Sequence, residues 1–126
     1  LSFWSYSCPP CLQELPSLSQ LSLNWSGPQL EIITVNTDPD KSENHELAKS
    51  FLQNEEIVVP TLFDHDRILS QAFGVAVYPK HFLVNPKGEM VWTAEGAFDW
   101  NSQNSRDRLL KLIEQRTPET NPDPQE

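Results

Sequence analysis

The chain has 126 residues, with 18 acidic side chains against 9 basic ones and a formal net charge of −9, and this length matches one small domain. The basic residues form no cluster, which excludes binding to nucleic acid or to an anionic membrane surface through a basic patch. No apolar run approaches the roughly 20 residues that cross a bilayer. We therefore expect one globular domain over residues 1–116.

The first predicted element is a strand over residues 1–6, where apolar and aromatic side chains partly alternate. Because the chain opens inside this strand, we expect further residues upstream, and any membrane anchor would have to lie there. After the strand, apolar residues recur at helical spacing: Cys11, Leu12, Leu15, Leu18, Leu21 and Leu23. The residues Cys8-Pro9-Pro10-Cys11 therefore mark a turn from a strand into a helix.

Cys8 and Cys11 are the only two cysteines of the chain. At a helix N-terminus, unpaired amides and the positive end of the helix dipole stabilise a thiolate, and the pKa of such a thiol falls to about 3.5–7.5. We therefore expect Cys8 to be the nucleophile and Cys11 to resolve the mixed disulfide. Pro9 and Pro10 remove two amide donors and restrict the backbone, so they should help to set the redox potential.

A zinc half-site and a fixed structural disulfide are the alternative interpretations of this pair. Zinc usually takes four ligands, but the chain has no second cysteine pair, and His45, His65 and His81 are scattered along it. We expect neither His45 and His65 nor Trp92 and Trp100 to converge on a site. A disulfide that closes so short a loop would restrict the unfolded chain little. The sequence thus predicts a redox-active pair, with no bound metal and no cofactor.

Two strand-and-helix units follow. Residues 30–36 are mostly β-branched and apolar, which predicts a strand covered on both faces. Ser42 can cap the helix that comes next. Residues 58–63 predict a short strand, and Asp64 or Asp66 can cap a third helix.

The pattern then changes to a hairpin, with strands over residues 81–85 and 89–93. A last helix follows, with Ser102 or Ser105 as its cap. The element order β-α-β-α-β-α-β-β-α predicts a mixed central sheet with helices on both faces. Residues 117–126 contain no apolar residue other than proline, so we expect a disordered, solvated tail there.

These motifs resemble thioredoxin-fold thiol-disulfide oxidoreductases, most of all the TlpA/ResA-like group. The matching residues are Phe3-Trp4 before the cysteines, Glu14 and Pro16 after them, Gly74-Val75, Tyr78-Pro79, and residues 82–89. The extra strand-and-helix segment between Asn36 and Gly74 matches as well. The resemblance implies an α/β, thioredoxin-like fold: a mixed central β-sheet flanked by helices, with the βα insertion of TlpA-like and peroxiredoxin-like proteins.

By this resemblance, Cys8 is the exposed nucleophile and Cys11 the resolving thiol. Glu14 matches the acid that the group keeps near the resolving cysteine, where it would take the proton of that thiol. A solvated acid that merely favours the helix dipole is the alternative for Glu14. Pro79 takes the place of the cis-proline, which leaves the backbone of Tyr78 free to pair with an extended substrate.

The substrate-binding residues that the resemblance implies are Trp4, Tyr6, Pro9, Tyr78 and Pro79. Ser2 departs from the pattern, because it stands where thioredoxin carries a buried aspartate, and this shifts the proton transfer towards Glu14. Lys80 and His81 stand where the family usually has threonines. A lysine near Cys8 would lower the pKa of that thiol.

The implied function is exchange of disulfides with protein partners, as a monomeric reductant outside the bacterial cytoplasm that serves cytochrome c maturation or disulfide repair. A second dithiol system would regenerate the pair. Two alternatives stay open. One is a thiol peroxidase of the peroxiredoxin type, although Ser5 is the only hydroxyl residue at the spacing of that family's Thr-x-x-Cys motif. The other is a non-enzymatic thioredoxin-like adaptor or copper-handling module.

Overall fold

The computed structural model describes residues 1–115, which fold into five strands and four helices. In chain order they are β1 (Ser2–Trp4), α1 (Pro9–Asn24), β2 (Thr34–Asn36), α2 (Glu43–Asn54), β3 (Thr61–Phe63), α3 (Ile68–Ala72), β4 (Lys80–Val84), β5 (Met90–Glu95) and α4 (Gln103–Gln115). This is the predicted order. The tail expected over residues 117–126 lies outside the described residues.

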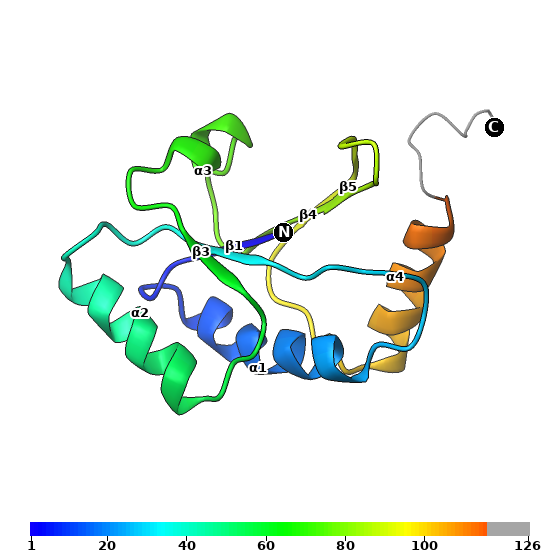
Figure 1. Cartoon of the computed structure of the whole chain (residues 1–126), viewed down its shortest axis with the longest axis horizontal. Helices are drawn as coiled ribbons and strands as arrows, with labels where there is room; N and C mark the ends of the chain where they lie inside the picture. The colour runs from blue at the N-terminus through cyan, green and yellow to red at the C-terminus, as the bar shows by residue number, and fades with distance from the viewer. Residues whose placement is uncertain (116–126) are drawn as a thin grey trace.

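The five strands form one mixed sheet in the order β3-β2-β1-β4-β5 (Figure 1). β1 is the central strand, parallel to β2 on one side and antiparallel to β4 on the other. Ser2 shows this double pairing, because it lies opposite Thr34 of β2 and opposite His81 of β4. The chain that leads into the two cysteines therefore starts from the middle of the sheet.

Both faces of the sheet are covered, as predicted. Figure 1 shows α3 on one side and α1, α2 and α4 on the other. Consecutive residues of β1 point to opposite faces. Phe3 packs with Val35 and Phe82 on the side of α3. Trp4 belongs to the larger cluster, which contains Leu15 of α1 together with residues of α2 and α4. Within residues 1–115, no helix is long and apolar enough to cross a membrane.

Two helices begin with the predicted hydroxyl caps. The Ser42 hydroxyl accepts a hydrogen bond from the amide of His45 at 3.1 Å. The Ser102 hydroxyl accepts one from the amide of Ser105, also at 3.1 Å, so that Ser102 is the cap of the two candidates. Each bond satisfies an amide that has no partner within its helix.

α3 is capped from a distance by Asp64. The residue at the N-cap position is Arg67, in the left-handed conformation with φ of 63° and without a side-chain cap bond. The Asp64 carboxylate instead accepts hydrogen bonds from the amides of Leu69 and Ser70 at 3.1 and 2.8 Å. Gly74, with φ of 67°, follows the helix and favours its end.

The strands β2 and β3 are shorter than their apolar patterns indicate. Pairing covers residues 34–36 and 61–63, whereas the sequence predicts strands over 30–36 and 58–63. The physical reason is the central strand, because β1 supplies only three residues for pairing. Leu30 and Ile32 bury apolar surface against the larger core without joining the sheet.

Candidate active site

Cys8 and Cys11 form a disulfide at the first turn of α1, with Cα atoms 5.3 Å apart. Cys8 is the N-cap residue, and Pro9 and Pro10 occupy the first two helical positions. Prolines fit there because the first amides of a helix have no partner within the helix. The first amide that remains belongs to Cys11, and it donates to the Cys8 Sγ at 3.3 Å. One backbone donor therefore faces the sulfur of the predicted nucleophile.

The two sulfurs differ in their access to solvent. Cys8 is half-buried, whereas Cys11 is only 1% exposed and packs with the core residues of α1. An attacking partner can therefore reach Cys8 first.

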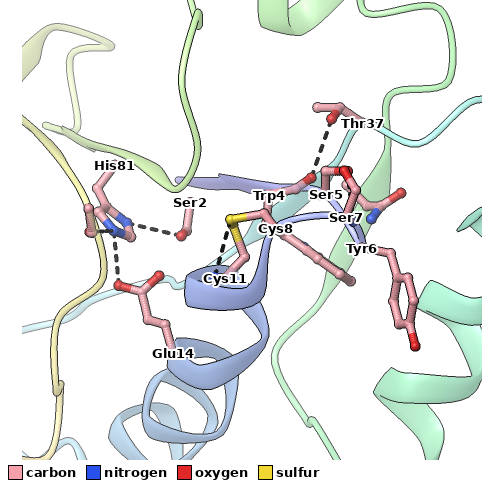
Figure 2. Close-up of a disulfide and its surroundings, with 12 residues drawn as sticks. Ser2, Trp4, Ser5, Tyr6, Ser7, Cys8, Cys11, Glu14, Thr37 and His81 are labelled. Atoms are coloured by element: carbon pink, nitrogen blue, oxygen red, sulfur yellow. Dashed lines mark hydrogen bonds and ion pairs between the residues drawn. A yellow bond between two sulfur atoms is a disulfide. The ribbon is translucent and has the colours of Figure 1, made fainter.

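Glu14 lies one turn after Cys11 on the same helix and is only 3% exposed. Its Oε2 accepts hydrogen bonds from the Trp100 indole at 2.9 Å and from the Phe98 amide at 3.0 Å. The Nε2 of His81 lies 2.9 Å from the same oxygen (Figure 2). The alternative of a solvated acid at Glu14 is thus wrong, because tertiary packing encloses this carboxylate.

His81 connects the carboxylate of Glu14 to the central strand. Its Nε2 lies 2.9 Å from Glu14 Oε2 and 3.0 Å from the carbonyl oxygen of Gly96, so two acceptors place a proton on this nitrogen. Its Nδ1 lies 3.0 Å from the Ser2 hydroxyl. Figure 2 shows Ser2, His81 and Glu14 on the Cys11 side of the disulfide. The serine in place of the thioredoxin aspartate is thus hydrogen-bonded to a histidine.

Aromatic rings close this polar group off from water. The rings of Phe98 and Trp100 lie edge-on to the His81 ring, with centroids 5.5 and 5.4 Å away. The expectation that Trp100 does not converge with other residues on a site is therefore wrong, and His81 joins it there. Both contact Glu14, because β4 and the segment after β5 lie beside α1 in the fold. The sequence did not reveal these contacts, because the residues lie far apart along the chain. The only signal in the sequence was His81, which stands where the family usually has a threonine.

Asp38 organises the loop in front of Cys8. It is 3% exposed and accepts hydrogen bonds from the Ser5 hydroxyl at 2.8 Å, the Tyr6 amide at 2.9 Å and the Asn36 amide group at 2.9 Å. The sequence alone assigned no role to this residue. A buried carboxylate held by three donors fixes the backbone immediately before the cysteines.

The predicted substrate surface is exposed only in part. Tyr6 and Tyr78 are half-buried and Pro9 is exposed. The Tyr78–Pro79 peptide bond is cis, and the Pro79 ring is fully buried, so Pro79 can act only through the backbone of Tyr78. Trp4, by contrast, is 1% exposed and donates its indole hydrogen to Thr34, so it cannot touch a docked partner. Because of its position in β1, the Trp4 side chain points into the core.

Lys80 pairs with Glu95 and not, as the sequence suggested, with the Cys8 sulfur. Its ammonium lies 3.1 Å from a carboxylate oxygen of Glu95, its cross-strand neighbour. Within residues 1–115, no hydrogen bond or ion pair joins Lys80 to Cys8.

A second polar cluster lies beyond Asp38. Asp40, His45 and His65 each place one possible ligand atom within 4.8 Å of the others. The expectation that His45 and His65 stay apart is therefore wrong. α2 begins after β2 and His65 follows β3, and these neighbouring parallel strands end at the same edge of the sheet.

This strand order, with a C-x-x-C disulfide at the first turn of α1 and a cis-proline before β4, defines a thioredoxin-like fold. The profile of the AhpC/TSA family matches residues 1–93, and the chain belongs to this family.

Two curated relatives come from Bacillus subtilis. The thiol-disulfide oxidoreductase ResA is 32% identical over 111 residues, which cover 88% of this chain and 60% of ResA. The sporulation thiol-disulfide oxidoreductase A is 27% identical over 109 residues, which cover 82% of this chain and 66% of that protein. The chain thus spans about two thirds or less of the length of each relative. These similarities place it in the TlpA/ResA-like group.

The fold comparison agrees. The crystal structure of StoA from Bacillus subtilis matches with a TM-score of 0.73 at 24% identity, covering 89% of this chain and 78% of that one. This match confirms the expected thioredoxin-like fold.

Proposed function

We propose that this chain is a protein thiol-disulfide oxidoreductase that reduces disulfides in protein partners. One observation carries the proposal: the disulfide joins a solvent-reachable Cys8 at a helix N-terminus to a buried Cys11 beside the buried carboxylate of Glu14. The names of the two Bacillus relatives support the same reaction class. No cofactor takes part, because the sulfur atoms carry the electrons.

The reaction has two displacement steps. The Cys8 thiolate attacks one sulfur of the partner disulfide, which forms a mixed disulfide and releases the other partner sulfur as a thiolate. Cys11 then loses its proton and attacks Cys8. The Cys8–Cys11 disulfide forms, and the partner leaves as a dithiol. The partner gains two electrons, which the Cys8–Cys11 pair loses.

Glu14 is the proton acceptor for Cys11 in this scheme. The three donors around the carboxylate converge on Oε2, which leaves Oε1 to take the proton. The proton can then pass to the departing partner thiolate. His81 acts through Glu14 as a positioning residue, because it touches the carboxylate rather than either cysteine.

The start of the helix supports the proposed reducing direction. Donors that stabilise the Cys8 thiolate stabilise the reduced protein and make it a stronger oxidant. Pro9 and Pro10 remove two of these donors, and the Cys11 amide is the one that contacts the sulfur. With so few donors, the pair should keep a low, reducing potential.

The family resemblance supports a setting for the reaction. We propose that the protein acts outside the cytoplasm, as a monomer that another dithiol system regenerates. Cytochrome c maturation and disulfide repair are the processes in which a reductant of this group is expected to act.

The first experiment is a redox titration of the full chain in dithiothreitol and glutathione buffers, with Cys8→Ser as the control. A two-electron couple near the thioredoxin value of about −270 mV would support the reductant. A value near about −120 mV would make the protein a disulfide donor instead. The absence of any reversible couple would contradict the enzyme and favour the alternative of a non-enzymatic adaptor or copper-handling module.

The AhpC/TSA match keeps one second candidate in view, a thiol peroxidase. The Ser5 hydroxyl, at the spacing of the peroxidase threonine, donates to Asp38 at 2.8 Å and is thus engaged away from Cys8. Consumption of hydrogen peroxide by the reduced protein, measured beside the reduction of a protein disulfide, separates the two functions. Peroxide turnover that is faster than disulfide exchange would favour the peroxidase.

A further inference from the structure

The cluster of Asp40, His45 and His65 lies outside the disulfide site and takes no part in the proposed reaction. Its residues come from three segments: the loop after β2, the first turn of α2 and the loop after β3. The Nε2 atoms of both histidines lie 3.9 Å from the same Oδ1 of Asp40. Two imidazole nitrogens thus face one carboxylate oxygen, at a distance too long for a hydrogen bond.

His65 is oriented as a ligand for a metal ion would be. Its Nδ1 lies 3.2 Å from the backbone carbonyl oxygen of Asp38, and a carbonyl can only accept, so Nδ1 carries the proton. The lone pair of the ring is then on Nε2, the atom that faces Asp40. A backbone carbonyl behind the ring is the usual way in which proteins orient a histidine towards a metal ion.

His45 supplies an independent observation, because it is a buried imidazole without a hydrogen-bond partner. The residue is 6% exposed, and its Nδ1 has no partner within residues 1–115. Its Nε2 faces Asp40 at 3.9 Å. Its Nε2 makes no hydrogen bond within the described residues either, because 3.9 Å is too long for one. A cation bound between Nε2 and the Asp40 carboxylate would give the ring its first polar partner, on the nitrogen other than Nδ1.

We propose that Asp40, His45 and His65 bind a divalent transition-metal cation of the zinc type. Two imidazole nitrogens and one carboxylate oxygen suit this class of ion, and three protein ligands leave a position for water. Tetrahedral coordination with bonds of about 2.0–2.2 Å places neighbouring donors about 3.3–3.6 Å apart. The two Asp40–histidine distances of 3.9 Å are close to this spacing, and the three ligand atoms all lie within 4.8 Å of one another. Small side-chain movements, above all of the exposed Asp40, would close the site.

The proposed site adjoins the loop that Asp38 holds. The Asp38 carbonyl orients His65, and the Asp38 carboxylate binds Ser5 and Tyr6 just before Cys8. The metal site is nevertheless separate from the redox pair, since none of its ligands is a cysteine. Its test does not depend on the proposed exchange reaction.

The test uses the oxidised full chain, in which the disulfide prevents the cysteines from acting as ligands. Calorimetric titration with Zn²⁺ should give one equivalent bound per chain. Asp40→Asn and His65→Gln should each weaken this binding at least about tenfold. Asp66→Asn is the matched control, because it removes an exposed carboxylate from the loop that carries His65. The affinity of this variant for Zn²⁺ should equal that of the parent protein.

Spectroscopy identifies the ligands without substituting the buried His45, whose replacement could unfold the chain. Co²⁺ should give d–d bands without a thiolate charge-transfer band, and Zn²⁺ should shift the imidazole ¹⁵N signals of His45 and His65 but not those of His81. Failure of the oxidised protein to bind one equivalent would overturn the proposal. So would binding that survives both ligand substitutions, or binding that occurs only after the disulfide is reduced.

Discussion

Glu14 and His81 form a buried acid–imidazole pair, an arrangement that is costly unless its hydrogen bonds are complete. Moving a charged group out of water costs several kcal/mol, and donors around the charge must offset this cost. Here the carboxylate has three such donors, from His81, Phe98 and Trp100. This shell holds the carboxylate in one place, one turn from Cys11. In our proposal, Glu14 takes the proton of Cys11 and His81 positions Glu14.

Replacing Glu14 by glutamine should slow the resolving step. Glutamine keeps the size of the side chain but cannot take a proton, and general-base catalysis contributes about 10²–10⁴-fold. The mixed disulfide between Cys8 and a partner should therefore accumulate in Glu14→Gln, as measured by quenched flow and mass spectrometry. Glu95→Gln is the control, because this exposed acid pairs with Lys80 away from the cysteines. Resolution at the parental rate in Glu14→Gln would show that the carboxylate is structural.

At the scale of elements, α3 illustrates how one side chain holds a short helix. The helix has five residues, and Asp64 binds its first free amides together with the Ser70 hydroxyl. Burial acts to raise the pKa of the Asp64 carboxyl. The hydrogen bonds from Ser70 and Leu69, with the nearby His65, outweigh burial and lower this pKa overall. The ionised carboxylate is thus the form that supports α3.

Replacing Asp64 by alanine should lower the free energy of unfolding by about 1 kcal/mol at pH 7. A lowered folded-state pKa adds stability above the unfolded-state value of about 3.9, and this is lost as pH falls through the folded-state pKa. The gap between Asp64→Ala and the parent should therefore close in strong acid. Urea unfolding at a series of pH values measures the gap, with Asp66→Ala as the control. A gap that stays constant down to pH 2 would contradict this role.

The order of the elements, the two cysteines and Glu14 could be predicted from the sequence, whereas the contacts that surround Glu14 could not. Hydrophobic periodicity and capping residues act locally, so Ser42 and Ser102 fixed the starts of two helices. The donors to Glu14 lie 84 and 86 residues away along the chain, and no local pattern reports such a contact. The length of β2 also depended on its partner, since pairing with β1 starts at Thr34.

For the whole molecule, the sheet separates two cores of unequal size, and burial on the larger one should dominate stability. Leu18 and Leu23 lie on the same helix, with 4% and 62% of their surface exposed. Leu18→Ala should cost about 2–5 kcal/mol, because it removes buried methyl groups and leaves a cavity. Leu23→Ala should stay within about 0.5 kcal/mol of the parent. Urea unfolding of the two variants tests the difference, and equal costs would contradict the assigned face of α1.

The disulfide closes a loop of only one helical turn, since its cysteines are three positions apart. Reduction and unfolding together form a closed thermodynamic cycle. The difference in unfolding free energy between the oxidised and reduced proteins therefore equals the difference in reduction free energy between the native and unfolded disulfides. For this two-electron couple, about 30 mV corresponds to about 1.4 kcal/mol. Any donor that holds the Cys8 thiolate thus stabilises the reduced fold and weakens it as a reductant by the same amount. Two denaturation curves, one of the oxidised and one of the reduced protein, would therefore report how far the native potential lies from that of the unfolded disulfide, without any redox buffer.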